Sequence, residues 1–123
     1  MYKKKQSYSA IWKNIEYNIG SAFDASNGKF TCPYDGIYSF YATSAIYNQH
    51  DGHIDIYVNG SLKIHHYLYN HGAGHYEYKH VSPQGVFKLG KGETVHIRMH
   101  GSFYYASSEW IRTYFQGHLI DLL

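Results

Sequence analysis

Histidine is the residue type in this chain that is most suited to chemistry, since ten of the 123 residues are histidine. Neutral imidazole is a preferred ligand of zinc-type metals, so histidine pairs in flexible loops are candidate metal ligands. His71 and His75 flank a glycine-rich loop, and His50 and His53 lie in or beside a second polar loop. We take His71 and His75 as the candidate metal ligands; ordinary surface or interface histidines are the alternative.

Histidines within the predicted strands are poorer candidates. His96 and His100 share one strand face but lie about 13 Å apart, so they cannot hold one ion within a single subunit. His65 and His66 are adjacent, and adjacent strand residues point to opposite faces. A metal site is therefore expected in the loops.

Residues 101–112 form a long segment that is rich in aromatic side chains and also carries an acid and an arginine. Aromatic faces stack on sugar rings, a carboxylate accepts from hydroxyl groups, and a guanidinium binds carboxylate or phosphate. We expect a ligand site here, formed by Tyr104, Tyr105, Glu109, Trp110 and Arg112. The alternative is that Phe103, Trp110 and Ile111 only close the end of the fold.

The motifs of common enzyme classes are absent from the sequence. There is no Gly-x-Ser-x-Gly elbow, no His-Glu-x-x-His pair and no phosphate-binding loop. Cys32 is the only cysteine, which excludes an intrachain disulfide and favours a buried thiol over an intermolecular bridge. We expect that the protein is not an enzyme.

The elements that position these residues are predicted to be antiparallel strands. Turn signals at Asn27-Gly28, Asp35-Gly36 and Asn59-Gly60 separate segments rich in aromatic and β-favouring residues, and no segment has a helical period. One strand places Tyr38, Phe40 and Ala42 on one face and Ile37 and Tyr41 on the other. A later strand points Ile54, Ile56 and Val58 inward, and another places Val95, Ile97 and Met99 on one face.

Composition favours one turn-rich all-β domain. Charged residues make up 16% of the chain and aromatic residues 19%, and the net charge is +2. We expect a flexible lead-in over residues 1–7 and a globular domain over residues 8–123, beginning with a strand at Tyr8. The lysine run at residues 3–5 is typical of a solvated tail, and no apolar run is long enough for a membrane span. Neither a nucleic-acid partner nor a membrane span is expected.

Several segments occur in the order and at about the spacing of one known family. They are Tyr8-Ser9-Ala10, Tyr17-Asn18-Ile19-Gly20, Ala22-Phe23-Asp24, Gly28-Lys29-Phe30-Thr31-Cys32-Pro33, Asp35-Gly36-Ile37-Tyr38 with Phe40, Val58-Asn59-Gly60, Leu89-Gly90-Lys91-Gly92-Glu93-Thr94-Val95 and Tyr114-Phe115-Gln116-Gly117-His118-Leu119-Ile120. Over nearly its whole length the chain resembles the globular domain of the complement C1q family. The resemblance implies a ten-stranded jelly-roll β-sandwich of the C1q/TNF type that forms trimers and is typically secreted.

The residues themselves also favour a homotrimer. A second apolar face on an antiparallel strand needs a cover, and a neighbouring subunit is the simplest one. The residues on such second faces are Ile37, Tyr41, Tyr114, Ile120 and Leu122. If His96, His100 or His118 lies between subunits, we expect the assembly to loosen below about pH 6.

Calcium-binding relatives hold the ion between the glycine-rich loop and the Leu-x-x-Gly-Asp turn. This sequence departs from that pattern, because the region offers His71, His75, Glu77 and Lys79, and only Glu93 keeps an oxygen at the turn. Calcium prefers about six to eight oxygen ligands. We expect no required cofactor, and a zinc-type divalent metal rather than calcium if one binds.

The leading functional hypothesis is a secreted, homotrimeric pattern-recognition protein that binds glycans or microbial surface polysaccharide. It rests on the resemblance to short, lectin-like C1q-domain proteins of invertebrate innate immunity. The alternatives are a trimeric ligand for a protein receptor, as in cerebellin-like and adipokine-like relatives, and a histidine-based metal carrier. Exposed aromatic and polar residues in end loops favour the lectin, an apolar patch on the outer wall favours the receptor ligand, and converging imidazoles favour the metal carrier.

Overall fold

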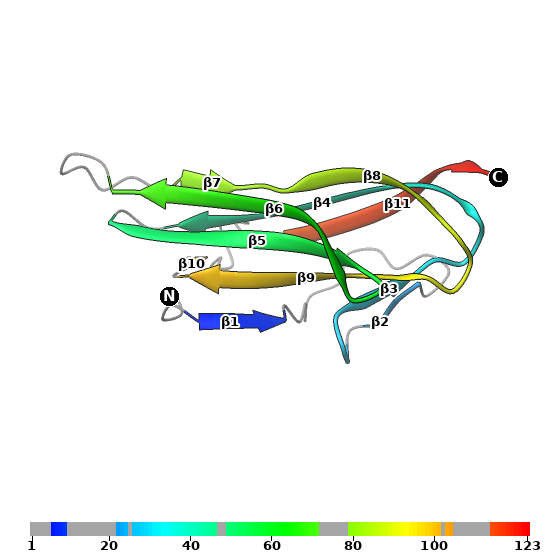
Figure 1. The fold of residues 1–123 in the computed structure, drawn as a ribbon, viewed down its shortest axis with the longest axis horizontal. Helices are drawn as coiled ribbons and strands as arrows, with labels where there is room; N and C mark the ends of the chain where they lie inside the picture. Colours follow the sequence, from blue (N-terminus) through cyan, green and yellow to red (C-terminus); the bar gives the residue numbers. More distant parts are fainter. Residues whose placement is uncertain are drawn as a thin grey trace.

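The fold is an all-β sandwich, seen in a computed structural model that describes residues 6–9, 22–24, 26–46, 49–71, 79–101, 103–104 and 114–123 (Figure 1). The described residues form strands and turns and no helix. The strands are β1 (Gln6–Ser9), β2 (Phe23–Asp24), β3 (Lys29–Thr31), β4 (Gly36–Ile46), β5 (His50–Val58), β6 (Ser61–Asn70), β7 (Lys79–Val81), β8 (Gln84–Leu89), β9 (Thr94–Gly101), β10 (Phe103–Tyr104) and β11 (Tyr114–Leu122). No helix of the described chain is long and apolar enough to cross a membrane.

Two antiparallel sheets make the two layers. One sheet has the order β2-β3-β9-β5-β6, with β1 also paired to β9. In the other sheet β4 is central, and it pairs with β11, β8, β7 and β10. The long strands of both layers run along the same axis, so the sandwich has two ends at which the connecting segments gather (Figure 1).

The core lies between the layers, and the predicted alternation along β4 is confirmed. Tyr38, Phe40 and Ala42 are fully buried, whereas Ile37 and Tyr41 on the other face are half-buried. The ring of Phe40 lies 5.1 Å from that of Phe30 in an edge-to-face contact. Each fully buried apolar side chain of this kind contributes about 1.5–3 kcal/mol to folding.

The opposite layer supplies the other half of the core, again as predicted. Ile54, Ile56 and Val58 are buried as expected, and the predicted shared face of Val95, Ile97 and Met99 is also buried. Cys32 joins this core with 1% of its surface exposed, and its burial raises the pKa of its thiol to about 11. The predicted buried thiol is confirmed, and a thiol in this position is poorly accessible to a partner for the alternative of an intermolecular disulfide.

The hairpin between β5 and β6 has the predicted Asn-Gly turn. Asn59 and Gly60 have φ angles of 50° and 80°, which both central residues of a type I′ turn require. The Asn59 side chain also accepts a hydrogen bond from Thr94 N–H at 2.9 Å and donates one to the Glu93 carboxylate. These bonds attach the turn to the start of β9.

A β-bulge follows this turn and shifts the pairing by one residue. Val58 pairs with Ser61 and Tyr57 with Leu62, but Ile56 then pairs with Ile64, so Lys63 is the extra residue on β6. The shift places Ile56 and Ile64 on the same inward face. It also places Asp55 opposite His65 on the outward face.

The first strand begins earlier than expected. β1 starts at Gln6, so Gln6 and Ser7 belong to a strand rather than to the flexible lead-in, and Ser7 pairs with His100 of β9. The remainder of the expected lead-in lies outside the described residues, and the division of the chain at residue 8 stays a prediction.

Candidate functional site

The outer face of the β9-β5-β6 region carries a cluster of imidazoles around one carboxylate. Asp55 Oδ1 lies 2.7 Å from His65 Nδ1 and 3.1 Å from His53 Nδ1. One ligand atom from each of these three residues lies within 4.8 Å of the others. A carboxylate only accepts hydrogen bonds, so each contacting Nδ1 carries the proton that it donates.

Burial differs across this cluster. The Asp55 side chain is 7% exposed, His53 is 25% exposed and His65 is 48% exposed. Among the described residues, the two imidazoles are the hydrogen-bonding partners of Asp55. A nearly buried carboxylate is thus contacted by one partly buried and one half-exposed imidazole.

A third imidazole extends the cluster onto β9. The ring of His100 stacks on that of His53, with centroids 5.1 Å apart and an angle of 15° between the planes. The rings of His53 and His65 lie 4.6 Å apart. Cross-strand pairing explains the arrangement, because His53 is directly opposite His100 on β9.

Sequence reasoning missed this cluster. A regular hairpin around the Asn59-Gly60 turn would pair Asp55 with Ile64, and only the bulge at Lys63 brings His65 opposite Asp55. The sequence does contain a pattern that indicates the bulge. Ile64 and Leu68 are apolar and must face the core together with Ile56, but a regular two-residue hairpin would turn them to the outer face.

The structure describes both members of one predicted histidine loop pair and only one member of the other. His50 and His53 both lie in β5, so their prediction as a loop pair is wrong, and their three-residue spacing points them to opposite faces. His71 is exposed and stacks on Tyr69, with ring centroids 4.4 Å apart. Its expected partner His75 lies outside the described residues, so the pairing of His71 with His75 stays a prediction.

The prediction for the adjacent histidines is confirmed. His65 faces outward to Asp55, whereas His66 faces the other layer, where its Nδ1 accepts a hydrogen bond from Ser82 N–H at 3.0 Å. His66 therefore links β6 to the turn before β8.

His96 lies farther along the outer face of β9 and has a distinct environment. It stacks on Tyr57 with ring centroids 5.1 Å apart, and its buried Nδ1 has no hydrogen-bond partner among the described residues. Its burial, together with the nearby charges of Lys29 and Arg98, lowers the pKa of this imidazole. His96 is therefore held in the neutral form.

The predicted ligand segment is described only at its edges. Tyr104 lies in β10 opposite Ala45, while Tyr105, Glu109, Trp110 and Arg112 lie outside the described residues. The strand that follows begins at Tyr114, opposite Thr43. Phe103 is fully buried, which agrees with the expectation that it closes the end of the fold.

Both predicted site segments start and end near the same end of the sandwich. Residues 72–78 are flanked by His71 and by Lys79, which pairs with Ile46 at the end of β4. Residues 105–113 are flanked by Tyr104 and Tyr114, which pair with the same part of β4. The described residues that flank the predicted ligand segment therefore lie at the same end of the molecule as those that flank the predicted metal segment.

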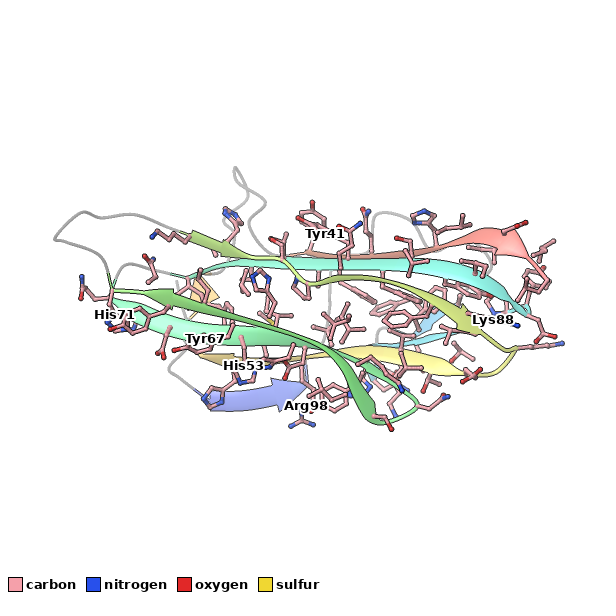
Figure 2. The ribbon with its side chains drawn as sticks, turned by 45° about the horizontal axis from the view of Figure 1, so that its top comes forward. Tyr41, His53, Tyr67, His71, Lys88 and Arg98 are labelled. Carbon is pink, nitrogen blue, oxygen red and sulfur yellow. The ribbon has the colours of Figure 1, made fainter. Side chains whose placement is uncertain are left out.

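Exposed tyrosines on β6 line the outer wall that leads to this end. Tyr67 and Tyr69 are 47% and 64% exposed, and the Tyr67 hydroxyl donates to Asp51 Oδ2 at 2.6 Å. Figure 2 shows Tyr67 and His71 close to the same end of the sandwich, and Lys88 at the far end. The wall combines aromatic faces with a carboxylate, which is a chemistry suited to sugar rings.

The outer face of the other sheet carries exposed apolar side chains among polar ones. Val86 on β8 and Ile120 at the bulge of β11 are 58% and 53% exposed. Gln84 and Lys88 on β8 and His118 on β11 are exposed polar neighbours. Between these strands, Tyr41 on β4 packs against Tyr114 with ring centroids 5.6 Å apart. Tyr41 lies on the outer side of its sheet, whereas His53 and Arg98 lie on the outer side of the opposite sheet (Figure 2).

An open groove of about 500 Å³ lies at the end of the sandwich that carries Lys88. Lys63, Lys88 and Glu93 are its charged lining residues. Glu93 is already engaged, because its carboxylate accepts from Gly90 N–H and from the Asn59 amide. The charged groups that line the groove are therefore two lysines and one carboxylate that is already hydrogen-bonded, so the lining does not offer a pair of carboxylates for hydrolysis.

Comparisons with known proteins agree on one family. The family model of the C1q domain matches residues 1–120. The chain is 32% identical over 107 residues to Caprin-2 of Danio rerio, which covers 86% of this chain and 11% of that protein. It is 31% identical over 97 residues to complement C1q tumor necrosis factor-related protein 3 of Homo sapiens, which covers 76% of this chain and 37% of that protein. The chain thus spans well under two thirds of either relative.

The solved structures support the fold. The globular domain of zebrafish complement 1qA protein aligns with a TM-score of 0.63 and 19% sequence identity, covering 98% of this chain and 86% of that one. This likeness confirms the predicted jelly-roll sandwich. From the family match, the relatives and the fold together, this chain belongs to the C1q domain family.

Proposed function

We propose that this chain is a secreted C1q-domain recognition protein that forms homotrimers and binds carbohydrate or other repetitive surface patterns rather than catalysing a reaction. The observation that carries the proposal is the difference between the two outer faces. One face carries exposed aliphatic side chains that a neighbouring subunit would cover, and the other carries exposed tyrosines and polar groups suited to a hydrated ligand.

The outer face of the β4 sheet is the proposed subunit interface. Val86 and Ile120 are each more than half exposed on this sheet, and Ile37 and Tyr41 lie on β4 between their strands. Burying each such side chain contributes up to about 1.5–3 kcal/mol. His118, which is opposite Ser39 on this face, is the one predicted interface histidine placed here; His96 and His100 belong to the other sheet.

The proposed ligand site lies at the end of the sandwich where β4, β6 and β10 end. Tyr69 and His71 are exposed there, and Tyr104 leads into the segment that carries Tyr105 and Arg112. A sugar makes few apolar contacts and competes with water for each hydrogen bond, so one site binds weakly. Three sites on one trimer would raise apparent affinity for a repetitive surface by about 10²–10⁴.

A glycan-array screen of the purified chain, followed by binding to beads coated with the best glycan, tests this proposal. We expect Tyr69→Ala, Tyr105→Ala and Arg112→Ala each to raise the apparent Kd at least about tenfold, because each lost contact is repeated in every subunit. Tyr34→Ala is the matched control, since Tyr34 is 57% exposed but precedes β4 at the opposite end. Unchanged binding by all three variants would contradict the site.

A ligand for a protein receptor is the second candidate. One observation favours it: Leu62 is 50% exposed on β6, on the same outer wall as Tyr67. A receptor interface would make Leu62→Lys weaken binding of a captured protein partner, whereas glycan binding at the far end of β6 would be unchanged. The glycan array therefore separates the two functions.

A further inference from the structure

We propose that His53, Asp55 and His65 bind one divalent cation of the zinc type on the outer face of β5 and β6. This site is separate from the predicted loop pair His71 and His75, and it does not depend on the proposed recognition function. Its ligands lie on two hydrogen-bonded strands rather than in a loop.

The distances suit a small cation. Ligand atoms about 2.0–2.2 Å from a tetrahedral zinc ion lie about 3.4 Å from one another. The two Nδ1 atoms are already 2.7 Å and 3.1 Å from the carboxylate oxygens, and all three ligand atoms fall within 4.8 Å of each other. Changes of up to about 1.4 Å in the distances between these atoms, made by the side chains, would bring them to that spacing.

Charge also favours a cation. Asp55 is nearly buried, and its hydrogen-bonding partners among the described residues are two imidazoles. Arg98 is opposite Asp55 on β9, but its guanidinium lies over the Tyr57 ring, 5.9 Å from the centroid. A nearly buried carboxylate is stabilised by a positive ion close to it.

The ligand set selects the kind of metal. Two imidazole nitrogens and one carboxylate oxygen match borderline divalent ions, whereas calcium requires more oxygens than this site provides. A neutral imidazole can carry its proton on Nε2 instead of Nδ1, which frees the Nδ1 lone pair without changing the charge of the ring. The half-exposed side of His65 leaves a coordination position for water or a ligand.

The rigidity of the site comes from its neighbours. His100 stacks on His53 at 5.1 Å and limits the rotation of that ring. The bulge at Lys63 sets the pairing that brings His65 to Asp55. A site built on paired strands needs little reordering when the ion binds.

Calorimetric titration of zinc chloride into the chelator-stripped chain tests the proposal. We expect one saturable site per chain with a Kd in the micromolar range or tighter. His65→Ala and Asp55→Asn should each raise that Kd at least about tenfold, because both remove a direct ligand. Calcium chloride should give no saturable binding.

His71→Ala is the matched control, since His71 is also exposed on the β6 side but belongs to the predicted loop pair. Circular dichroism checks that every variant is folded; His65 is half exposed, so its replacement tests the site even if Asp55→Asn disturbs folding. Cobalt(II) provides a second readout, because a tetrahedral site gives intense visible absorption that zinc abolishes. Absence of a saturable site, or equal binding by parent and His65→Ala, would overturn the proposal; loss of binding only in His71→Ala would move the metal to the loops.

Discussion

Asp55 shows how much one buried side chain can depend on its partners. The carboxylate is 7% exposed, and the two imidazoles that contact it satisfy its oxygens. Removing one partner would leave a buried charge with fewer hydrogen bonds, which costs more than a surface contact contributes. The same residues therefore serve the stability of the sheet and provide the ligand atoms of the proposed metal site.

His96 should make the protein less stable in acid. Its pKa is lowered from 6.5 by burial and by Lys29 and Arg98, while Tyr57 covers its ring. Between the lowered pKa and 6.5 the unfolded chain binds more protons than the folded chain, so the free energy of unfolding falls as pH drops through 6.5. We expect His96→Gln to lose less stability than the parent between about pH 7.5 and pH 5.5, as measured by urea unfolding midpoints.

The control for this prediction is His80→Gln, because His80 is an exposed histidine on β7. It should keep the acid sensitivity of the parent. An equal loss of stability in the parent and in His96→Gln would show that His96 does not contribute.

At the scale of elements, two glycines perform different tasks in their strands and turns. Gly60 has a φ of +80° with open space around the position of a Cβ atom, so its role is to permit the turn. Gly117 lies on β11, where a Cβ would come within 2.5 Å of the Phe40 ring. Its role is to allow β11 to pair with β4 directly beside the fully buried Phe40 ring.

These roles predict different costs of substitution. Gly60→Ala should destabilise the protein by about 1–2 kcal/mol, because a left-handed backbone conformation is unfavourable for alanine. The added methyl group would make no steric clash. Gly117→Ala should cost about 2–3 kcal/mol and alter the near-ultraviolet circular dichroism, because Phe40 must move within the core. Chemical denaturation measures both; an unchanged aromatic spectrum in Gly117→Ala would contradict the close packing.

At the scale of the whole molecule, the exposed apolar side chains on the outer face of the β4 sheet favour the expected assembly. Ile120 lies at a bulge in β11 and is 53% exposed, so Ile120→Lys places a charge on the proposed interface without entering the core. Analytical ultracentrifugation should show a trimer of 14.3 kDa chains for the parent and smaller species for this variant.

Leu62→Lys is the matched control for the assembly, because Leu62 is 50% exposed but lies on β6 of the other sheet. It should remain trimeric. A parent chain that sediments as a monomer at micromolar concentration would contradict the interface, and so would dissociation of both variants to the same extent. His118 lies on the face of the proposed interface. Of the three histidines predicted to lie between subunits, it is therefore the one whose protonation would loosen a trimer in acid.

Much of the fold follows from local pattern. The alternation of Tyr38, Phe40 and Ala42 against Ile37 and Tyr41 determines which face of β4 is buried, because strand side chains point to opposite sides in turn. Asn59 and Gly60 determine a type I′ turn, because both positions require positive φ. These are properties of neighbouring residues, so the sequence by itself determined them, together with the buried state favoured for Cys32.

The proposed metal site depends on pairing between strands, which the tertiary structure alone decided. His53, Asp55 and His65 are not close in a sequence motif, and a regular hairpin would pair Asp55 with Ile64. The inward packing of Ile56 with Ile64 is satisfied by a bulge at Lys63, and that shift carries His65 to the carboxylate. The burial of Ile64 in the core thereby determines which side chains meet on the outer face. Local strand or turn propensities do not predict this burial.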